Sequence, residues 1–110
     1  MALKESEIIA LLAKFLSERG EIVKVNENNE NFVIGTKEYK PDLFTIDKDN
    51  VVTGIYEIKL SVDETMLQNF KELADSVNFY LVVPEKEETK AKDIIKRNKI
   101  KVKEVYTFTE

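Results

Sequence analysis

Three side chains that could hold a divalent cation and a phosphate lie within one short stretch of the sequence. Asp42 follows Pro41, and the tripeptide Glu57-Ile58-Lys59 ends an apolar run that begins at Val51. Carboxylate oxygens with few protein ligands and room for water suit Mg²⁺. An adjacent lysine can then hold a phosphate oxygen or orient an attacking water. This chemistry requires that all three side chains share one surface.

The residues between the two acids predict a β-hairpin that brings them together. Two apolar runs flank the polar segment 47–50, which is typical of antiparallel strands joined by a turn. With a tight turn centred on Asp49-Asn50, Asp42 falls directly opposite Glu57, at a Cβ separation of about 4.5–5.5 Å. Lys59 is two residues further on and points to the same face. A loop two residues longer leaves Asp42 diagonal to Glu57 on that face.

Two carboxylates at this separation repel, so one pKa is raised unless a cation lies between them. A divalent cation would relieve the repulsion. The purely structural alternative is an exposed hairpin face that carries a cross-strand ion pair, which contributes little to stability.

The pair of motifs Pro41-Asp42 and Glu57-x-Lys59 resembles the signature of the PD-(D/E)XK nucleases. This superfamily includes restriction endonucleases and archaeal Holliday-junction resolvases. The resemblance implies an αβββαβ core and Mg²⁺-dependent hydrolysis of phosphodiester bonds, with Mn²⁺ able to substitute. It implies that Asp42, Glu57 and the backbone carbonyl of Ile58 hold the metal. Lys59 would position or polarise the attacking water, which makes Asp42, Glu57 and Lys59 the catalytic residues.

The first helix is expected to add a further acid to this site. Residues 3–19 carry apolar side chains at helical spacing, and Gly20 ends the pattern. In many relatives of the resembled family a Glu on the first helix supports the metal. Glu5 matches that position by its phase on the helix, and Glu7 is the second choice. Glu5 could instead be a first-turn acid stabilised by the helix dipole.

The order of elements along the chain predicts an α/β protein of the α+β kind, with a mixed sheet and helices on both faces. In the terms of the resemblance, this is a restriction-endonuclease-like αβββαβ core with an extra α-β unit. The predicted elements are a helix at 3–19, a strand at 21–26, extended structure resuming at 32–34, the hairpin, a helix to about 76, a strand at 78–83, a helix at 85–98 and a strand at 101–108.

Some positions keep two interpretations. Ser61 with Glu64 fits a capping box, while Asp63 fits the N-cap of a helix that starts one turn later. Lys37 and Lys40 flank the approach to Pro41, either as phosphate contacts or as solvated lysines. Gln68 and Lys71, on the helix that follows the hairpin, are either exposed or beside the cleft, and no role is assigned to them.

Composition limits the remaining function classes. The 110 residues suit one domain, 1–110, and they contain no histidine and no cysteine. A Ser-His-Asp triad, a Cys-His pair, a His-ligated zinc and disulfides are therefore excluded. The sequence has no long apolar run and no signal-peptide pattern, so we expect a cytoplasmic protein without a membrane partner.

The net charge of −4 argues against a protein that coats DNA indiscriminately, since such binding depends on cationic contacts to phosphate. A local lysine patch can still bind nucleic acid, and we expect DNA as the partner. We also expect a homodimer, because a two-stranded target needs two cuts. The alternative is an inactive module of the same fold that binds nucleic acid or protein.

Overall fold

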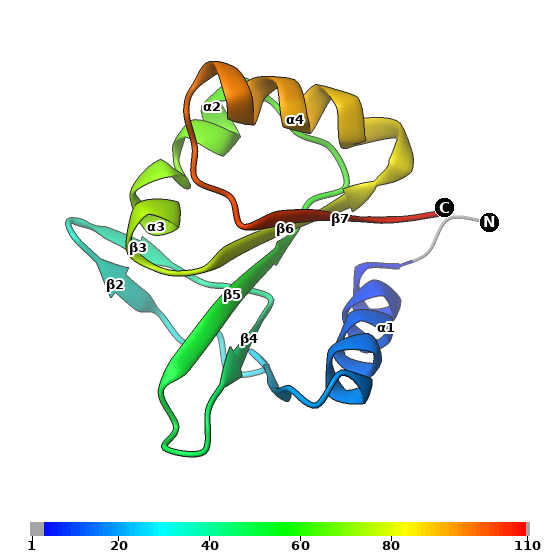
Figure 1. Ribbon diagram of the computed structural model, residues 1–110, viewed down its shortest axis with the longest axis vertical. Coiled ribbons are helices and arrows are strands. Elements are labelled where there is room, and N and C mark those ends of the chain that lie inside the picture. Colours follow the sequence, from blue (N-terminus) through cyan, green and yellow to red (C-terminus); the bar gives the residue numbers. More distant parts are fainter. Residues whose placement is uncertain (1–3, 110) are drawn as a thin grey trace.

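The structure, a computed structural model, describes residues 4–109, so the predicted start of the first helix at residue 3 lies outside the described part. Its centre is a five-stranded mixed sheet in the order β1-β4-β5-β6-β7 (Figure 1). β1, β4 and β5 pair antiparallel, while β5, β6 and β7 pair parallel. The mixed sheet and the antiparallel hairpin are as predicted. The strands are β1 (Ile22–Val25), β4 (Leu43–Ile46), β5 (Val52–Ile58), β6 (Phe79–Pro84) and β7 (Glu104–Phe108).

One face of the sheet is covered by α1 (Glu5–Glu18), whose apolar residues recur at helical spacing. Ile8, Leu12 and Leu16 are buried and pack on the side chains that β4, β5 and β6 direct to this face. Gly20, with φ of +88°, ends the helical segment in the left-handed conformation that glycine adopts without strain. The chain then enters β1.

The opposite face is covered by α2 (Glu64–Gln68), α3 (Lys71–Ser76) and α4 (Glu88–Arg97), the last preceded by a 3₁₀ turn, η1 (Glu85–Glu87). These elements enclose the larger of two apolar clusters, so helices lie on both faces as expected. The fully buried members of this larger cluster include Ile55, Leu67, Leu73, Phe79, Leu81, Val83 and Ala91.

The helix predicted to continue to about residue 76 is divided into α2 and α3. The Asp63 side chain accepts a hydrogen bond from the Met66 N–H at 2.8 Å, so Asp63 is the N-cap. At the break, the Tyr39 hydroxyl donates to the carbonyl of Asn69 at 3.1 Å and satisfies an acceptor that the interrupted helix leaves open. A side chain from a distant strand thus stabilises the division.

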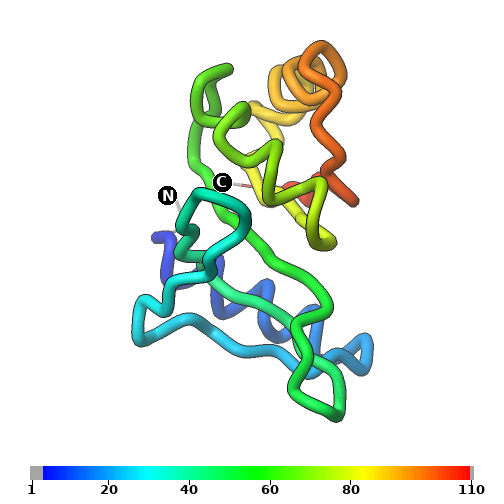
Figure 2. Tube along the Cα trace, turned by 90° about the vertical axis from the view of Figure 1, so that its left-hand side faces the viewer, coloured from blue at the N-terminus to red at the C-terminus, as the bar shows by residue number. Residues whose placement is uncertain are grey.

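A second, two-stranded sheet was not foreseen. β2 (Phe32–Ile34) and β3 (Lys37–Tyr39) pair antiparallel and form no part of the five-stranded sheet. The sequence predicted only a bend at Gly35, whereas the chain reverses there with a Gly35 φ of +62°. Figure 2 shows the teal tip of this β2–β3 hairpin next to the light-green segment of α3, which it contacts.

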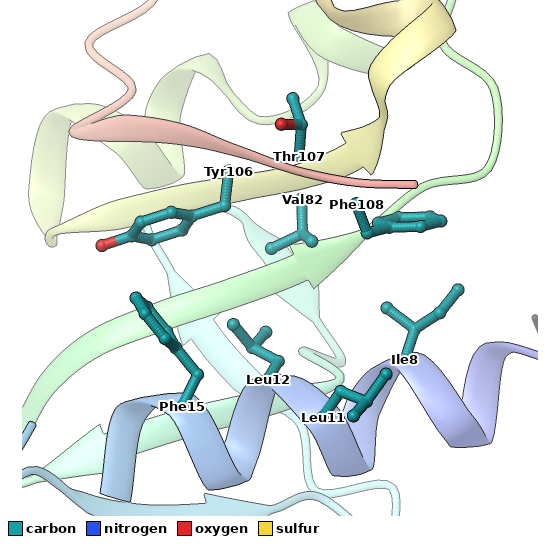
Figure 3. Close-up of a pocket in the computed structure, with 8 residues that line it drawn as sticks. All are labelled: Ile8, Leu11, Leu12, Phe15, Val82, Tyr106, Thr107 and Phe108. Carbon is teal, nitrogen blue, oxygen red and sulfur yellow. The ribbon is translucent and has the colours of Figure 1, made fainter. Parts of the chain in front are cut away.

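An apolar groove lies where α1 leaves β6 and β7 uncovered (Figure 3). It has a volume of about 210 Å³. Leu11 and Phe15 on its α1 side are 57% and 46% exposed, which is high for large apolar residues.

None of the helices within residues 4–109 combines the length and apolar character needed to cross a bilayer.

Candidate active site

The register of β4 and β5 next to the acids is the one predicted. Leu43 lies opposite Tyr56. Continuing the pairing by one residue sets Asp42 opposite Glu57. The two carboxyls therefore meet on one side of the hairpin without any contribution from a distant segment.

The turn that joins these strands differs from the tight two-residue turn expected. The Asp47 N–H donates to the Val51 carbonyl at 2.9 Å, which leaves a loop of residues 48–50. Asn50 closes the loop with a φ of +65°, a left-handed conformation that Asn tolerates better than most residues. An extra residue on the β5 side, Thr53, then restores the register through a β-bulge.

The carboxyl of Glu57 is the most unusual group of the site. Glu57 is only 4% exposed, because it lies in a central strand beneath the helices of the larger cluster. Burial, together with the charges of Asp42 and Glu5, raises its pKa to about 8 against the opposing effect of Lys59. The Lys59 Nζ lies 3.7 Å from the Glu57 Oε2. A buried acid with one long ion pair is costly to keep ionised.

Asp42 is held in place by the backbone of the partner strand. Its Oδ2 accepts a hydrogen bond from the Ile58 N–H at 2.7 Å. In an antiparallel pair the N–H and C=O of one residue point towards the same neighbour. The Ile58 carbonyl is therefore directed to the Asp42 side of β5, as the predicted ligand set requires.

The first helix brings Glu5 to the acids and uses Glu7 elsewhere. Partial burial, the charge of Asp42 and hydrogen bonding between the two carboxyls raise the pKa of Glu5, and Lys59 opposes them. Glu5 is exposed rather than core-facing. The Glu7 Oε1 accepts from the Lys4 N–H at 3.3 Å and thus caps the start of its own helix. Between the two alternatives, Glu5 is the one that lies near Asp42 and Glu57.

Glu57 lines a cleft of about 420 Å³ between the β2–β3 hairpin, β5 and the α2–α3 junction. The sequence left Lys37 and Lys40 as either phosphate contacts or solvated lysines, and both line this cleft. Its lining residues are Lys37, Glu38 and Tyr39 from β3 and Lys40 directly after it, Glu57 from β5 and Lys59 directly after it, and Asn69 and Phe70 from the junction.

Asn69 and Phe70 were missed, and the sequence holds little signal for them. Phe70 belongs to an apolar stripe, which predicts a core residue. The centre of its ring nevertheless lies 5.7 Å from the Lys59 Nζ, which is positioned over the ring face in a cation–π contact. Gln68, considered as a cleft residue, instead donates from Nε2 to the Asn98 Oδ1 at 3.0 Å. It is turned towards the end of α4.

The donor set matches a metal that needs few protein ligands. Within residues 4–109, no group of three or more Asp, Glu, His or Cys side chains is arranged as a ready metal site. Ca²⁺ takes six to eight oxygen ligands, whereas Mg²⁺ commonly keeps several waters and uses one or two carboxylates. Asp42 and Glu57 fit the second pattern, and the buried Glu57 carboxyl needs a cation if it is to be ionised at neutral pH.

Comparison of the chain with protein-family models, with curated proteins and with solved structures found no match. The support for a function therefore comes from the residues of the cleft and their geometry.

Proposed function

We propose that this protein is a Mg²⁺-dependent nuclease of the PD-(D/E)XK type that hydrolyses phosphodiester bonds in DNA. The observation that carries the proposal is the buried Glu57 carboxyl beside Asp42, with Lys59 at 3.7 Å, at the wall of an open cleft. A stable core has no use for such a group, since a buried carboxyl of raised pKa lowers stability wherever it is ionised. Its position at a cleft favours a chemical role.

The arrangement of elements is compatible with a restriction-endonuclease-like core. α1, β1, β4, β5, the α2–α3 pair and β6 supply the order αβββαβ, and α4 with β7 adds one α-β unit. The β2–β3 hairpin is then an insertion between the first and second strands of that core. In this correspondence, Asp42 directly precedes the second core strand and Glu57 lies on the third.

The residues of the chain divide the proposed reaction between them. Asp42, Glu57 and the Ile58 carbonyl would hold Mg²⁺, with Glu5 in support, and Mn²⁺ could substitute. The bound ion would lower the pKa of a water and offset the negative charge that develops on the phosphate. Lys59 remains available to position the water or to bind a phosphate oxygen. The cation–π contact with Phe70 restricts the positions that the Lys59 ammonium can adopt.

The second candidate is an inactive module of this fold that binds nucleic acid or protein. The net charge of −4 favours it, because a nuclease must hold a polyanionic substrate. It differs from the first candidate in requiring no metal.

Both candidates are tested by incubating the protein with branched, duplex and single-stranded DNA and with RNA, in Mg²⁺, Mn²⁺ or EDTA. A nuclease should cleave at least one substrate in either metal and none in EDTA. Binding without cleavage in every condition would replace the nuclease by the inactive module.

We further expect the protein to be a homodimer. Each chain supplies one Asp42–Glu57 pair, and a two-stranded target needs two, which a two-fold dimer provides. Light scattering at tens of micromolar should give twice the mass of one chain. A single-chain mass with and without DNA would contradict this expectation.

A further inference from the structure

The β2–β3 hairpin packs on the core through Phe32, Ile34 and Tyr39, and other residues of it form a wall of the cleft. Val33, Lys37 and Glu38 are exposed, and half of the residues that line the cleft belong to β3 or directly follow it. Lys37 and Lys40 are the cations among them. Burial of apolar surface explains Phe32, Ile34 and Tyr39, but it does not explain the two exposed lysines at the cleft.

The base of the hairpin is fixed next to the acids. The Asn26 Nδ2 donates to the carbonyls of Glu30 at 3.1 Å and Pro41 at 2.9 Å, and its Oδ1 accepts from the Glu30 N–H at 2.9 Å. The Asn26 N–H also donates to the Asp42 carbonyl at 3.1 Å. One side chain thus closes segment 26–41 into a loop whose ends adjoin Asp42.

The body of the hairpin is held against the helices. Tyr39 is buried, its hydroxyl donates to the Asn69 carbonyl, and its ring stacks on Phe70 with centres 6.2 Å apart. At the tip, the Glu72 carboxylate occupies the space that a Cβ on Gly35 would need. The hairpin is therefore positioned at both ends, and its lysines are carried at a defined distance from the acids.

The cleft differs in charge from the chain as a whole. Three lysines, Lys37, Lys40 and Lys59, line it against two acids, Glu38 and Glu57. The chain carries a net charge of −4, yet the residues that line this cleft include one more lysine than acids. A local positive site on an acidic protein attracts an anion to that place in preference to the rest of the surface.

We propose that the β2–β3 hairpin is a nucleic-acid-binding arm on which Lys37 and Lys40 contact backbone phosphates adjacent to the one held at Lys59. The proposal deepens the nuclease assignment and rests on it for the position of the scissile phosphate. An ammonium is a point charge without the planar fork of arginine, so these contacts carry no base information. The buried rings of Tyr39 and Phe70 offer no exposed face for base stacking. The arm should therefore bind without sequence preference.

The test is the salt dependence of binding, measured by fluorescence anisotropy in EDTA with labelled single-stranded and duplex DNA. Between about 50 and 200 mM NaCl, Lys37→Ala and Lys40→Ala should each reduce the slope of log K against log salt by about 0.7–0.9. Near 0.1 M salt each should weaken binding by roughly five- to tenfold, equally on unrelated sequences. Lys→Arg at either position should retain the slope.

The matched control is Lys48→Ala. Lys48 is an exposed lysine in the β4–β5 loop, at the opposite end of these strands from the acids, and its removal should change neither slope nor affinity. All three lysines are exposed, so circular dichroism and thermal unfolding should match wild type.

Several outcomes would contradict the proposal that the β2–β3 hairpin binds nucleic acid. These are wild-type slopes in the Lys37 and Lys40 variants, an equal effect of Lys48→Ala, no DNA binding by wild type, or displacement of DNA by polyglutamate at equal charge concentration, which would indicate an acidic peptide instead. Failure of the nuclease gives a different result. If no substrate is cleaved but the lysine effects are present, the arm stands and the nuclease does not.

Discussion

Replacing Glu57 by Gln should abolish metal-dependent cleavage while the protein remains folded. The substitution keeps the shape of the side chain and removes the charge that would bind Mg²⁺. Asp42→Asn should behave alike, since the amide oxygen can still accept the hydrogen bond from the Ile58 N–H that positions this side chain. The measurement is the single-turnover rate on the best substrate of the cleavage panel, combined with calorimetric titration of Mn²⁺. Both variants should lose the binding isotherm together with the activity.

Lys59→Ala is the informative comparison for these variants. It leaves both carboxyls in place, so Mn²⁺ should still bind, while the rate should fall by roughly 10²–10³-fold as one electrostatic contact to the phosphate is removed. A variant that binds Mn²⁺ but cleaves slowly has lost the contact to the phosphate, whereas a variant that loses both has lost a metal ligand. This comparison distinguishes the role of Lys59 from the roles of Asp42 and Glu57. If Asp42→Asn cleaves every substrate at the wild-type rate and wild type shows no Mn²⁺ isotherm, the proposed nuclease is wrong.

The second large effect concerns stability and pH. The folded-state pKa of Glu57 is raised from 4.5 to about 8, chiefly by burial, so the native protein binds this proton more tightly than the unfolded chain. Stability from this group is complete below about pH 4.5, declines as pH rises, and is fully lost above about pH 8. The loss is on the order of 5 kcal/mol, since each pH unit within that window corresponds to about 1.4 kcal/mol.

The pKa of Glu5 is also raised, so the useful quantity is the difference in unfolding free energy between wild type and Glu57→Gln. Urea denaturation in EDTA should give similar values at about pH 5 and a clearly more stable variant at about pH 9. Adding Mg²⁺ should diminish the difference at high pH if the ion binds the ionised carboxyl. A difference that stays flat with pH would mean that Glu57 titrates like an unfolded-state acid.

The chemistry of the hairpin could be predicted because it depends on local rules. Side chains two residues apart share a face of a strand, so Glu57 and Lys59 had to point together. The polar segment between the apolar runs then set Asp42 opposite them. The register was correct although the turn was not, because the bulge at Thr53 compensates for the longer loop. Neither an odd loop nor a bulge has a clear signature in these residues.

The walls of the cleft could not be predicted, because they depend on contacts between distant segments. Lys37 and Lys40 acquire their position from a hairpin whose ends are fixed by Asn26 and whose side rests on α3. The division of the long helix depends on a hydrogen bond from Tyr39, 30 residues away from Asn69. Burial of Glu57 likewise follows from the helices that cover β5, which the alternation within one strand does not reveal.

The order of the main sheet has a consequence for how the protein behaves at high concentration. Within residues 4–109, β1 and β7 each have one edge without a strand partner. Open edges can template pairing with other chains and lead to aggregation. Both edge strands are short, and Lys24 and Glu104 place exposed charges on them. A second chain that added a strand at either edge would have to accommodate those charges, which protects the sheet against uncontrolled growth.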